Sequence, residues 1–237
     1  MVLKRENMKA LEKEAVRSVE RMASWLMMLP RVEKDSLKEE NTIFLVIDII
    51  NGFAEEGGTL YSPRVKGIIP DIVKLLDKFP KSDKYFFCDN HNEDSPEFKS
   101  FPSHATTGSW ESEVVDDLKR FVKEDNVVKK NSTNSMLAER YGRHFCDYVF
   151  DAYCLEEDKP VPTFVIVGDV TDICVMQAAL TLKAAMNERN IDTRILLPVD
   201  CVDTYDLDVS NHDGDLMNLF ALYNMNMNGI EVIANIE

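Results

Sequence analysis

Continuous apolar runs alternate along most of the chain with stretches in which apolar residues recur every three or four positions. The continuous runs predict strands buried on both faces, and the periodic stretches predict amphipathic helices. Predicted strands are residues 42–50, 84–88, 126–129, 163–167, 193–199 and 229–234. Predicted helices are 65–79, 110–123, 135–150, 172–189 and 213–225. Because strands separated by helices pair in parallel, we expect an α/β fold, a three-layer α/β/α sandwich with a mainly parallel central sheet.

The start of the chain has a different pattern. Apolar residues recur at helical spacing over residues 4–29 with charged residues between them, and Pro30 ends the pattern. We expect one amphipathic helix, a solvated connector over 31–41, and a boundary that separates 1–40 from an α/β domain over 41–237. The apolar face must dock on this domain or on another subunit, so we expect a homo-oligomer. Its members are Met8, Leu11, Ala15, Val19, Met22, Trp25 and Leu26.

Composition narrows the classes of protein. The 237 residues carry a formal net charge of -15, and the densest basic run is only Lys129 and Lys130, so we expect no nucleic-acid partner. None of the five cysteines forms a CxxC pair, which favours a reducing compartment. We see no signal peptide and no stretch of about 20 apolar residues, so we expect a cytoplasmic protein without a membrane partner.

Polar residues follow the predicted strands at their carboxyl ends, where ligands gather in open parallel sheets. Asp48 lies in the first strand, and Asp89 and His91 follow the second. Lys129 or Lys130 ends the third, and Cys174 follows the fourth. Since these ends meet at one edge of the sheet, we expect the side chains to form one site.

Cys174 lies in the segment GDVTDICV, where a strand, a glycine turn and a helix follow one another. In the first turn of a helix the backbone N–H groups and the dipole stabilise a thiolate, so we expect a lowered thiol pKa. The same N–H groups can hold a developing oxyanion. The alternative is a small buried thiol, because cysteine is among the most buried residue types. The strand–turn–helix context favours the nucleophile.

A cysteine nucleophile needs a base and a group that pairs with the anion. Asp48 is a candidate, because a carboxylate inside the apolar run LVIDII is costly unless it is paired. One of Lys129 and Lys130 could pair with it, and a desolvated carboxylate beside a lysine can take the thiol proton. The alternatives are a strand-end cap for Asp48 and a solvated pair for the lysines.

Three segments in this order and spacing, VIDIINGF, VVKKNSTNSM and GDVTDICV, resemble the signature segments of the isochorismatase-like cysteine hydrolases. The resemblance covers about residues 42–236 and would make the predicted domain a hydrolase of that fold. It implies a catalytic triad of Asp48, Lys130 and Cys174, with Lys129 as the alternative lysine. It also implies a cis peptide between Asp169 and Val170, which would turn the N–H groups of Val170 and Cys174 toward the substrate oxygen.

A second cluster lies in CDNHNEDSPEFKSFPSH, which contains Asp89, His91, Glu97 and His104. Carboxylate and imidazole groups at this spacing suit zinc, iron or manganese, although a polar loop with incidental histidines is the alternative. The segment resembles the metal loop of nicotinamidases, in which Asp, His and His bind a divalent metal and some members add a Glu. The resemblance implies a metal, zinc first, that takes the pyridine nitrogen of nicotinamide.

The resemblance implies an amidohydrolase that acts on a small-molecule amide, nicotinamide first. Two departures from the family concern the pocket wall: IINGF follows Asp48, and Met136 stands where many members have Phe. Phe53 and Trp110 could still bind a flat ring. We interpret His212 and Asp213 as a surface pair, and the alternative is a loop near the pocket. The alternatives are another small amide or carbamoyl substrate, or a catalytically silent binding homologue.

Overall fold

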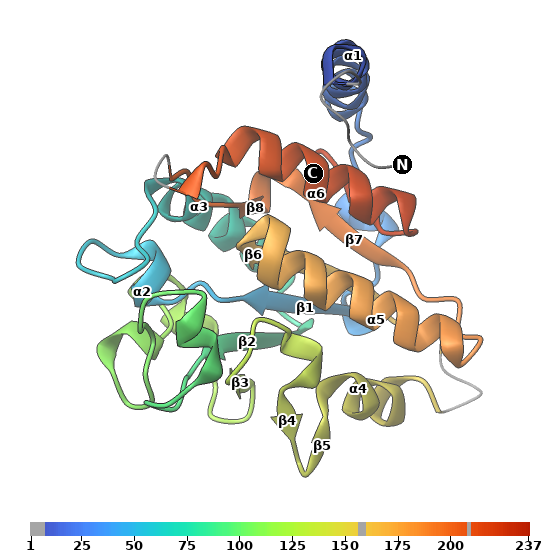
Figure 1. Cartoon of the computed structure of the whole chain (residues 1–237). Coiled ribbons are helices and arrows are strands. Elements are labelled where there is room, and N and C mark those ends of the chain that lie inside the picture. The colour runs from blue at the N-terminus through green and yellow to red at the C-terminus, as the bar shows by residue number, and fades with distance from the viewer. Residues whose placement is uncertain (1–7, 156–159, 208–209) are drawn as a thin grey trace.

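The computed structural model describes residues 8–155, 160–207 and 210–237. Its centre is a seven-stranded sheet in the order β3-β2-β1-β6-β7-β9, with β8 beside β6 (Figure 1). Each pairing between these strands is parallel, which confirms the predicted fold class. The strands are β1 Thr42–Ile47, β2 Asp83–Asp89, β3 Val127–Lys130, β6 Thr163–Asp169, β7 Ile195–Pro198, β8 Val202–Asp203 and β9 Glu231–Ile233.

Helices cover both faces of the sheet. The side chains of β1 alternate between two cores, as successive residues of a strand must. Phe44 and Val46 pack on the side of α3, whereas Ile43, Leu45 and Ile47 pack on the side of α4, α5 and α6. The helices are α2 Asn51–Ala54, α3 Pro63–Lys78, α4 Phe145–Tyr153, α5 Met176–Glu188 and α6 Gly214–Met227. A strand with no polar face therefore lies between two apolar layers.

The N-terminal helix α1, Met8–Leu26, lies outside this sandwich against α6 (Figure 1). Met22 is buried, and Trp25 packs edge-to-face on Tyr223 of α6 with ring centroids 5.4 Å apart. Val16, nearer the start, is 59% exposed. The helix thus docks on its own domain through its last turns. Residues 4–7 and the side chains of Met8 and Leu11 lie outside what the structure describes, and the predicted oligomer and domain boundary stay predictions.

The connector after α1 is less solvated than expected. Val32 forms a parallel bridge with Ile236, and Leu37 is buried in the core on the α3 side. Two 3-10 turns, Lys34–Ser36 and Glu39–Asn41, lead into β1. Most residues of the predicted solvated connector over 31–41 are exposed or partly exposed, but its backbone is tied to the end of the chain and Leu37 is buried.

Two segments that the sequence predicted as helices have other structures. Residues 110–123 form two 3-10 turns, Trp110–Ser112 and Asp116–Phe121, because Val115 N–H bonds to Ile49 O and Glu113 O accepts from Asn51 N–H. These tertiary bonds replace helical ones.

Residues 135–150 form a 3-10 turn, Ser135–Leu137, a hairpin of β4 Glu139–Arg140 and β5 Arg143–His144, and then α4. Tyr141 and Gly142 have φ values of 52° and 75°, as the two central residues of a type I′ hairpin turn require. The helical interpretation overlooked this turn. None of the helices that the structure describes is long and apolar enough to cross a membrane.

Gly168 lies where β6 passes closest to β1, which suggests a stability test. Its φ is +120°, and a Cβ there would sit 2.0 Å from Ile47 O. We expect Gly168→Ala to lower the free energy of unfolding by at least about 3 kcal/mol in urea denaturation. Gly67, exposed in α3 with open space around it, is the control. Gly67→Ala should raise the free energy of unfolding by about 0.5–1 kcal/mol. Equal effects of the two substitutions would contradict the packing argument.

Candidate active site

Four buried polar side chains meet beyond the carboxyl ends of neighbouring strands. Asp48 directly follows β1, and Asp89 and Lys130 are the last residues of β2 and β3. The register of β2 and β3 pairs Asp89 with Lys130, so both side chains leave the sheet on the same side. Cys174 lies in a π-helical turn, Thr171–Val175, between β6 and α5. The sheet topology thus brings together residues far apart in sequence.

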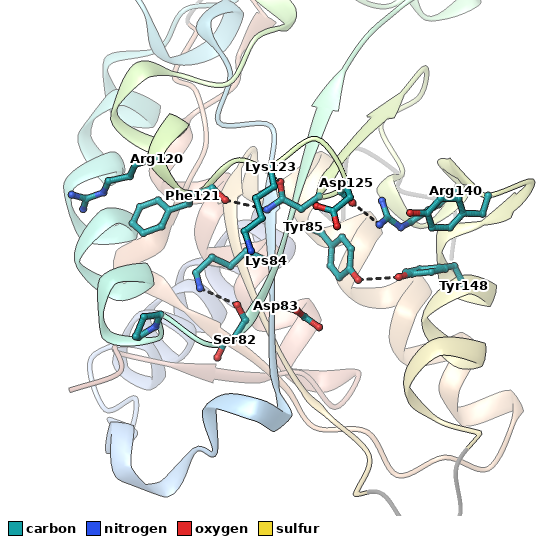
Figure 2. Close-up of a pocket in the computed structure, with 13 residues that line it drawn as sticks. Ser82, Asp83, Lys84, Tyr85, Arg120, Phe121, Lys123, Asp125, Arg140 and Tyr148 are labelled. Atoms are coloured by element: carbon teal, nitrogen blue, oxygen red, sulfur yellow. Dashed lines mark hydrogen bonds between the residues drawn. The ribbon is translucent and has the colours of Figure 1, made fainter.

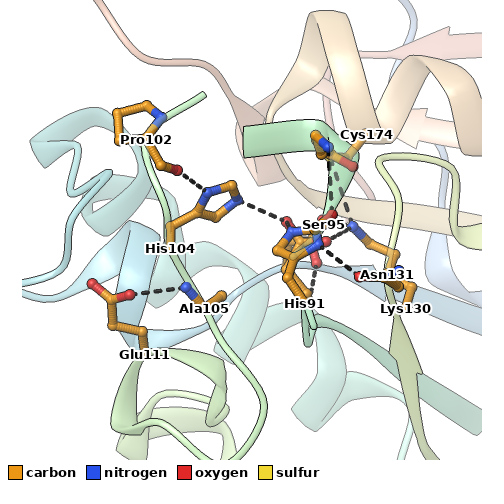
Figure 3. Close-up of polar contacts among 12 residues, drawn as sticks. His91, Ser95, Pro102, His104, Ala105, Glu111, Lys130, Asn131 and Cys174 are labelled. Carbon is orange, nitrogen blue, oxygen red and sulfur yellow. Dashed lines mark hydrogen bonds and ion pairs between the residues drawn. The ribbon is translucent and has the colours of Figure 1, made fainter. Parts of the chain in front are cut away.

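Lys130 is the centre of this group. Its Nζ lies 2.7 Å from Asp48 Oδ2 and 3.8 Å from Cys174 Sγ, and it also donates a hydrogen bond to Asp89 Oδ1 (Figure 3). The two carboxylates and the sulfur offer atoms that all lie within 4.8 Å of one another. Asp48 Oδ1 accepts the backbone N–H of Asp89 at 3.0 Å, which fixes its carboxylate.

The structure distinguishes the two lysines that the sequence left open. Side chains of β3 alternate, so Lys129 is exposed while Lys130 is 2% exposed. Lys130 and not Lys129 contacts the cysteine.

In this buried group the positive charge of the Lys130 ammonium offsets the negative charge of the carboxylates. Burial opposes ionisation of Lys130, but Asp48 and Asp89 raise its pKa well above the ordinary value. Burial, together with the charge of Asp89, raises the pKa of Asp48 to about 7. Burial also opposes ionisation of Asp89, yet the charge of Lys130 and the neighbouring rings of His104 and His91 hold its pKa below the usual range. Asp48 is therefore the carboxylate most easily protonated.

Cys174 departs from the expectation of a stabilised thiolate. Burial raises the pKa of its thiol well above the ordinary value, and although Lys130 opposes this, Asp48 and Asp89 add to it. The prediction of a lowered thiol pKa is wrong, because desolvation and two nearby carboxylates outweigh the helix start. In this arrangement the resting sulfur carries its proton, and a base beside it is required.

The peptide between Asp169 and Val170 is cis, at the position that the resemblance implied. Val170 O accepts from the N–H groups of Ile173 and Val175 and so closes the turn that carries Cys174. Asp169 is buried, and its Oδ2 has no hydrogen-bond partner among the described residues. Burial raises the pKa of Asp169 well above the ordinary value, which favours its neutral acid form.

Asp89, His91 and His104 form a second cluster whose ligand atoms lie within 4.8 Å of one another. Nε2 of His91 and Nε2 of His104 lie 3.4 and 3.6 Å from Asp89 Oδ2 (Figure 3). His104 Nδ1 donates to the carbonyl of Pro102 at 2.7 Å, and His91 Nδ1 faces Asn131 Oδ1 at 3.4 Å.

These outer contacts orient both rings so that each Nε2 faces the same point, as metal-binding histidines require. His91 Nε2 is buried and finds no hydrogen-bond partner among the described residues. The donor set of one carboxylate and two imidazoles suits a divalent metal such as zinc, so the residues fit such an ion.

Glu97 does not join this cluster. It lies in a 3-10 turn, Pro96–Lys99, where it is partly buried and lines the same cavity, and its carboxylate is outside the group of atoms within 4.8 Å. Burial and the charge of Asp89 raise its pKa. In this arrangement the structure places Asp89, His91 and His104 together, but not the expected fourth ligand Glu97.

A cavity of about 360 Å³ leads to both clusters. Cys174, Asp89 and His104 line it together with aromatic side chains, of which Phe53 packs on His104 with ring centroids 5.5 Å apart. Trp110 is not among the lining residues and is 49% exposed, so its predicted place in the pocket is wrong. The 3-10 turn that replaces the expected helix directs it outward.

The isochorismatase domain model matches residues 42–231 of the chain. The chain belongs to the isochorismatase family. It is 29% identical over 230 residues to nicotinamidase 1 of Arabidopsis thaliana, a match that spans 85% of this chain and 89% of the relative.

Solved structures share the fold of this isochorismatase-family hydrolase. A pyrazinamidase of Pyrococcus horikoshii in complex with zinc has 19% identity and a TM-score of 0.59, over 81% of this chain and 98% of that chain. PnC1 of L. infantum in complex with nicotinate has 13% identity and a TM-score of 0.64, over 87% and 98%.

His212 of this family member is not the surface residue expected from sequence. Its Nε2 lies 2.9 Å from Asp172 Oδ2, and its ring stacks on Tyr205 with centroids 3.8 Å apart. Sequence reasoning also missed Tyr61, Phe101 and Tyr205, which line the cavity. Tyr205 follows the two-residue strand β8, which is too short to give a recognisable apolar run.

A second cavity, of about 320 Å³, lies at the opposite end of β2 (Figure 2). Two of its cations bond to backbone carbonyls: Lys84 Nζ donates to those of Phe79 and Ser82, and Arg140 donates to that of Asp125. Neither cysteine nor histidine is among its described lining residues. The candidate chemistry therefore belongs to the first cavity.

Lys130 makes a testable contribution to stability. Lys130→Met would leave Asp48 and Asp89 side by side in a buried site without their counter-charge. We expect it to lower the free energy of unfolding by about 3 kcal/mol or more. Lys129→Met, on the exposed side of the same strand, should change it by less than about 0.5 kcal/mol. Urea denaturation followed by circular dichroism measures both, and a stable Lys130→Met protein would contradict the charge balance described above.

Proposed function

We propose that this protein is a cysteine-dependent amidohydrolase that converts nicotinamide to nicotinate and ammonia. The observation that carries the proposal is a buried thiol beside an aspartate and a lysine, next to an Asp-His-His cluster in one aromatic-lined cavity. The match to a nicotinamidase of Arabidopsis thaliana supports this substrate. So does the nicotinate named in the L. infantum structure.

The proposed reaction begins with proton transfer from Cys174 to Asp48, whose pKa of about 7 suits a base. The sulfur attacks the amide carbon, and the N–H groups of Val170 and Cys174 hold the oxyanion. Asp48 returns the proton to the leaving nitrogen, which departs as ammonia. A water deprotonated by Asp48 then attacks the thioester, which releases nicotinate and restores the thiol. Lys130 keeps its charge throughout and offsets the anion that forms.

Asp89, His91 and His104 would hold the metal, which we propose to be zinc, with iron or manganese as the other candidates. When bound, it would supply a Lewis acid that orients the pyridine ring. The zinc complex of the Pyrococcus horikoshii pyrazinamidase supports this choice. Glu97 would become a ligand only if its side chain moved, so we leave it out of the set. Phe53 would pack on the flat ring of the substrate.

Cys174→Ala tests the nucleophile. Without the sulfur no thioester can form, so ammonia release from nicotinamide should fall by at least about a thousandfold. Bound metal, measured by elemental analysis, should stay unchanged, because the sulfur is not in the Asp-His-His set. Cys154→Ala, at the end of α4, should keep full activity. An active Cys174→Ala protein would falsify the mechanism.

His104→Ala tests the metal centre. Loss of one of three ligands should lower the bound metal and reduce nicotinamide turnover by at least about a hundredfold. Dialysis of the wild-type protein against a chelator should have the same effect, and zinc, manganese or iron should restore activity. His144→Ala is the matched control, because His144 is exposed on the β4–β5 hairpin. Full turnover in chelated protein would contradict a role for the metal.

A further inference from the structure

One wall of the catalytic cavity is formed by Tyr205, which no step of the proposed reaction uses. We propose that Tyr205 is a specificity-determining residue that stacks on the aromatic ring of the amide substrate, and that the His212–Asp172 pair positions it. This inference rests on the proposed function, since it concerns the substrate of the same site.

The contacts of His212 fix the position of its ring. Its Nε2 lies 2.9 Å from Asp172 Oδ2, and its Nδ1 lies 3.0 Å from the backbone carbonyl of Tyr205. Thr204 Oγ1 donates to the other oxygen of Asp172 at 2.6 Å. The side chains of His212 and Asp172 are only 10% and 6% exposed, so this pair is largely shielded from solvent.

The His212–Asp172 pair connects the Tyr205 segment to the nucleophile. Asp172 lies in the same π-helical turn as Cys174, two residues before it. Its bonds reach Thr204 directly and Tyr205 through His212, and Arg64 Nε adds a bond to the carbonyl of Thr204 at 3.1 Å. The position of Tyr205 relative to the reacting sulfur is thus set by a short chain of hydrogen bonds.

The ring of Tyr205 has one face already occupied. The imidazole ring of His212 stacks on it with centroids 3.8 Å apart and planes 17° from parallel. The ring lines the cavity, as Phe53 and Phe101 do. A flat substrate ring gains contact energy on such aromatic surfaces that an aliphatic amide of similar size lacks. Tyr205 therefore favours aromatic amides over aliphatic ones.

The test measures dissociation constants on the Cys174→Ala background by titration calorimetry, with nicotinamide, benzamide and isobutyramide as probes. Benzamide has the ring without the pyridine nitrogen, so it reports stacking independently of the metal. We expect Tyr205→Leu to raise the dissociation constants of both aromatic amides by about three- to tenfold and to leave that of isobutyramide unchanged. Tyr205→Phe and Tyr205→Trp should restore aromatic binding, and His212→Ala should weaken it in the same way as Tyr205→Leu.

Tyr141→Leu and His144→Ala are the matched controls, because both residues are exposed on the hairpin. In the active enzyme, Tyr205→Leu should raise KM for nicotinamide while kcat stays within about twofold. The inference would be overturned if Tyr205→Leu weakened the binding of isobutyramide by the same factor, or if it left the binding of the aromatic amides unchanged. Aromatic amides that do not bind at all would overturn it as well. A wild-type protein that binds benzamide through Tyr205 yet releases no ammonia from nicotinamide contradicts the proposed function alone.

Discussion

The candidate site depends on one buried cation. Lys130 lies between two buried carboxylates and beside a thiol, and neither the ammonium nor the carboxylates could stay charged in the interior without each other. Burial alone would drive the ammonium to lose its proton and the carboxylates to gain one. Their mutual attraction reverses this for Lys130 and Asp89, whereas the pKa of Asp48 stays raised, at about 7. One residue of the group can therefore exchange a proton while its neighbours keep their charge.

The parallel sheet makes this grouping possible. In a parallel sheet all strands end at the same edge, so residues that close successive strands become neighbours although more than forty positions separate them in sequence. Gly168 allows β6 to approach Ile47 closely, and the chain then turns through the π-helical segment that presents Cys174. The fold places the acid, the ammonium and the sulfur on different elements, each held by its own backbone hydrogen bonds.

The sequence was most informative where burial dictates residue type. Continuous apolar runs located the central strands, and the polar residues that follow them, from Asp48 to Cys174, are those that meet in the structure. Prediction was wrong where tertiary bonds override local preference, as for Trp110 in its 3-10 turn. The thiol pKa was also predicted wrongly, because the segment GDVTDICV does not show how far other parts of the chain bury Cys174. Tyr205 was missed because β8, which precedes it, is only two residues long.

Asp89 uses its two oxygens differently. Oδ1 contacts Lys130, while Oδ2 faces both histidines of the Asp-His-His cluster. A cation bound at the histidines would draw electron density from this carboxylate and weaken its attraction for the Lys130 ammonium. The ammonium would then interact more strongly with Asp48 and the sulfur. The two halves of the site are for this reason one electrostatic unit. Filling or emptying the Asp-His-His half would change the charge felt by the catalytic half through this one shared carboxylate.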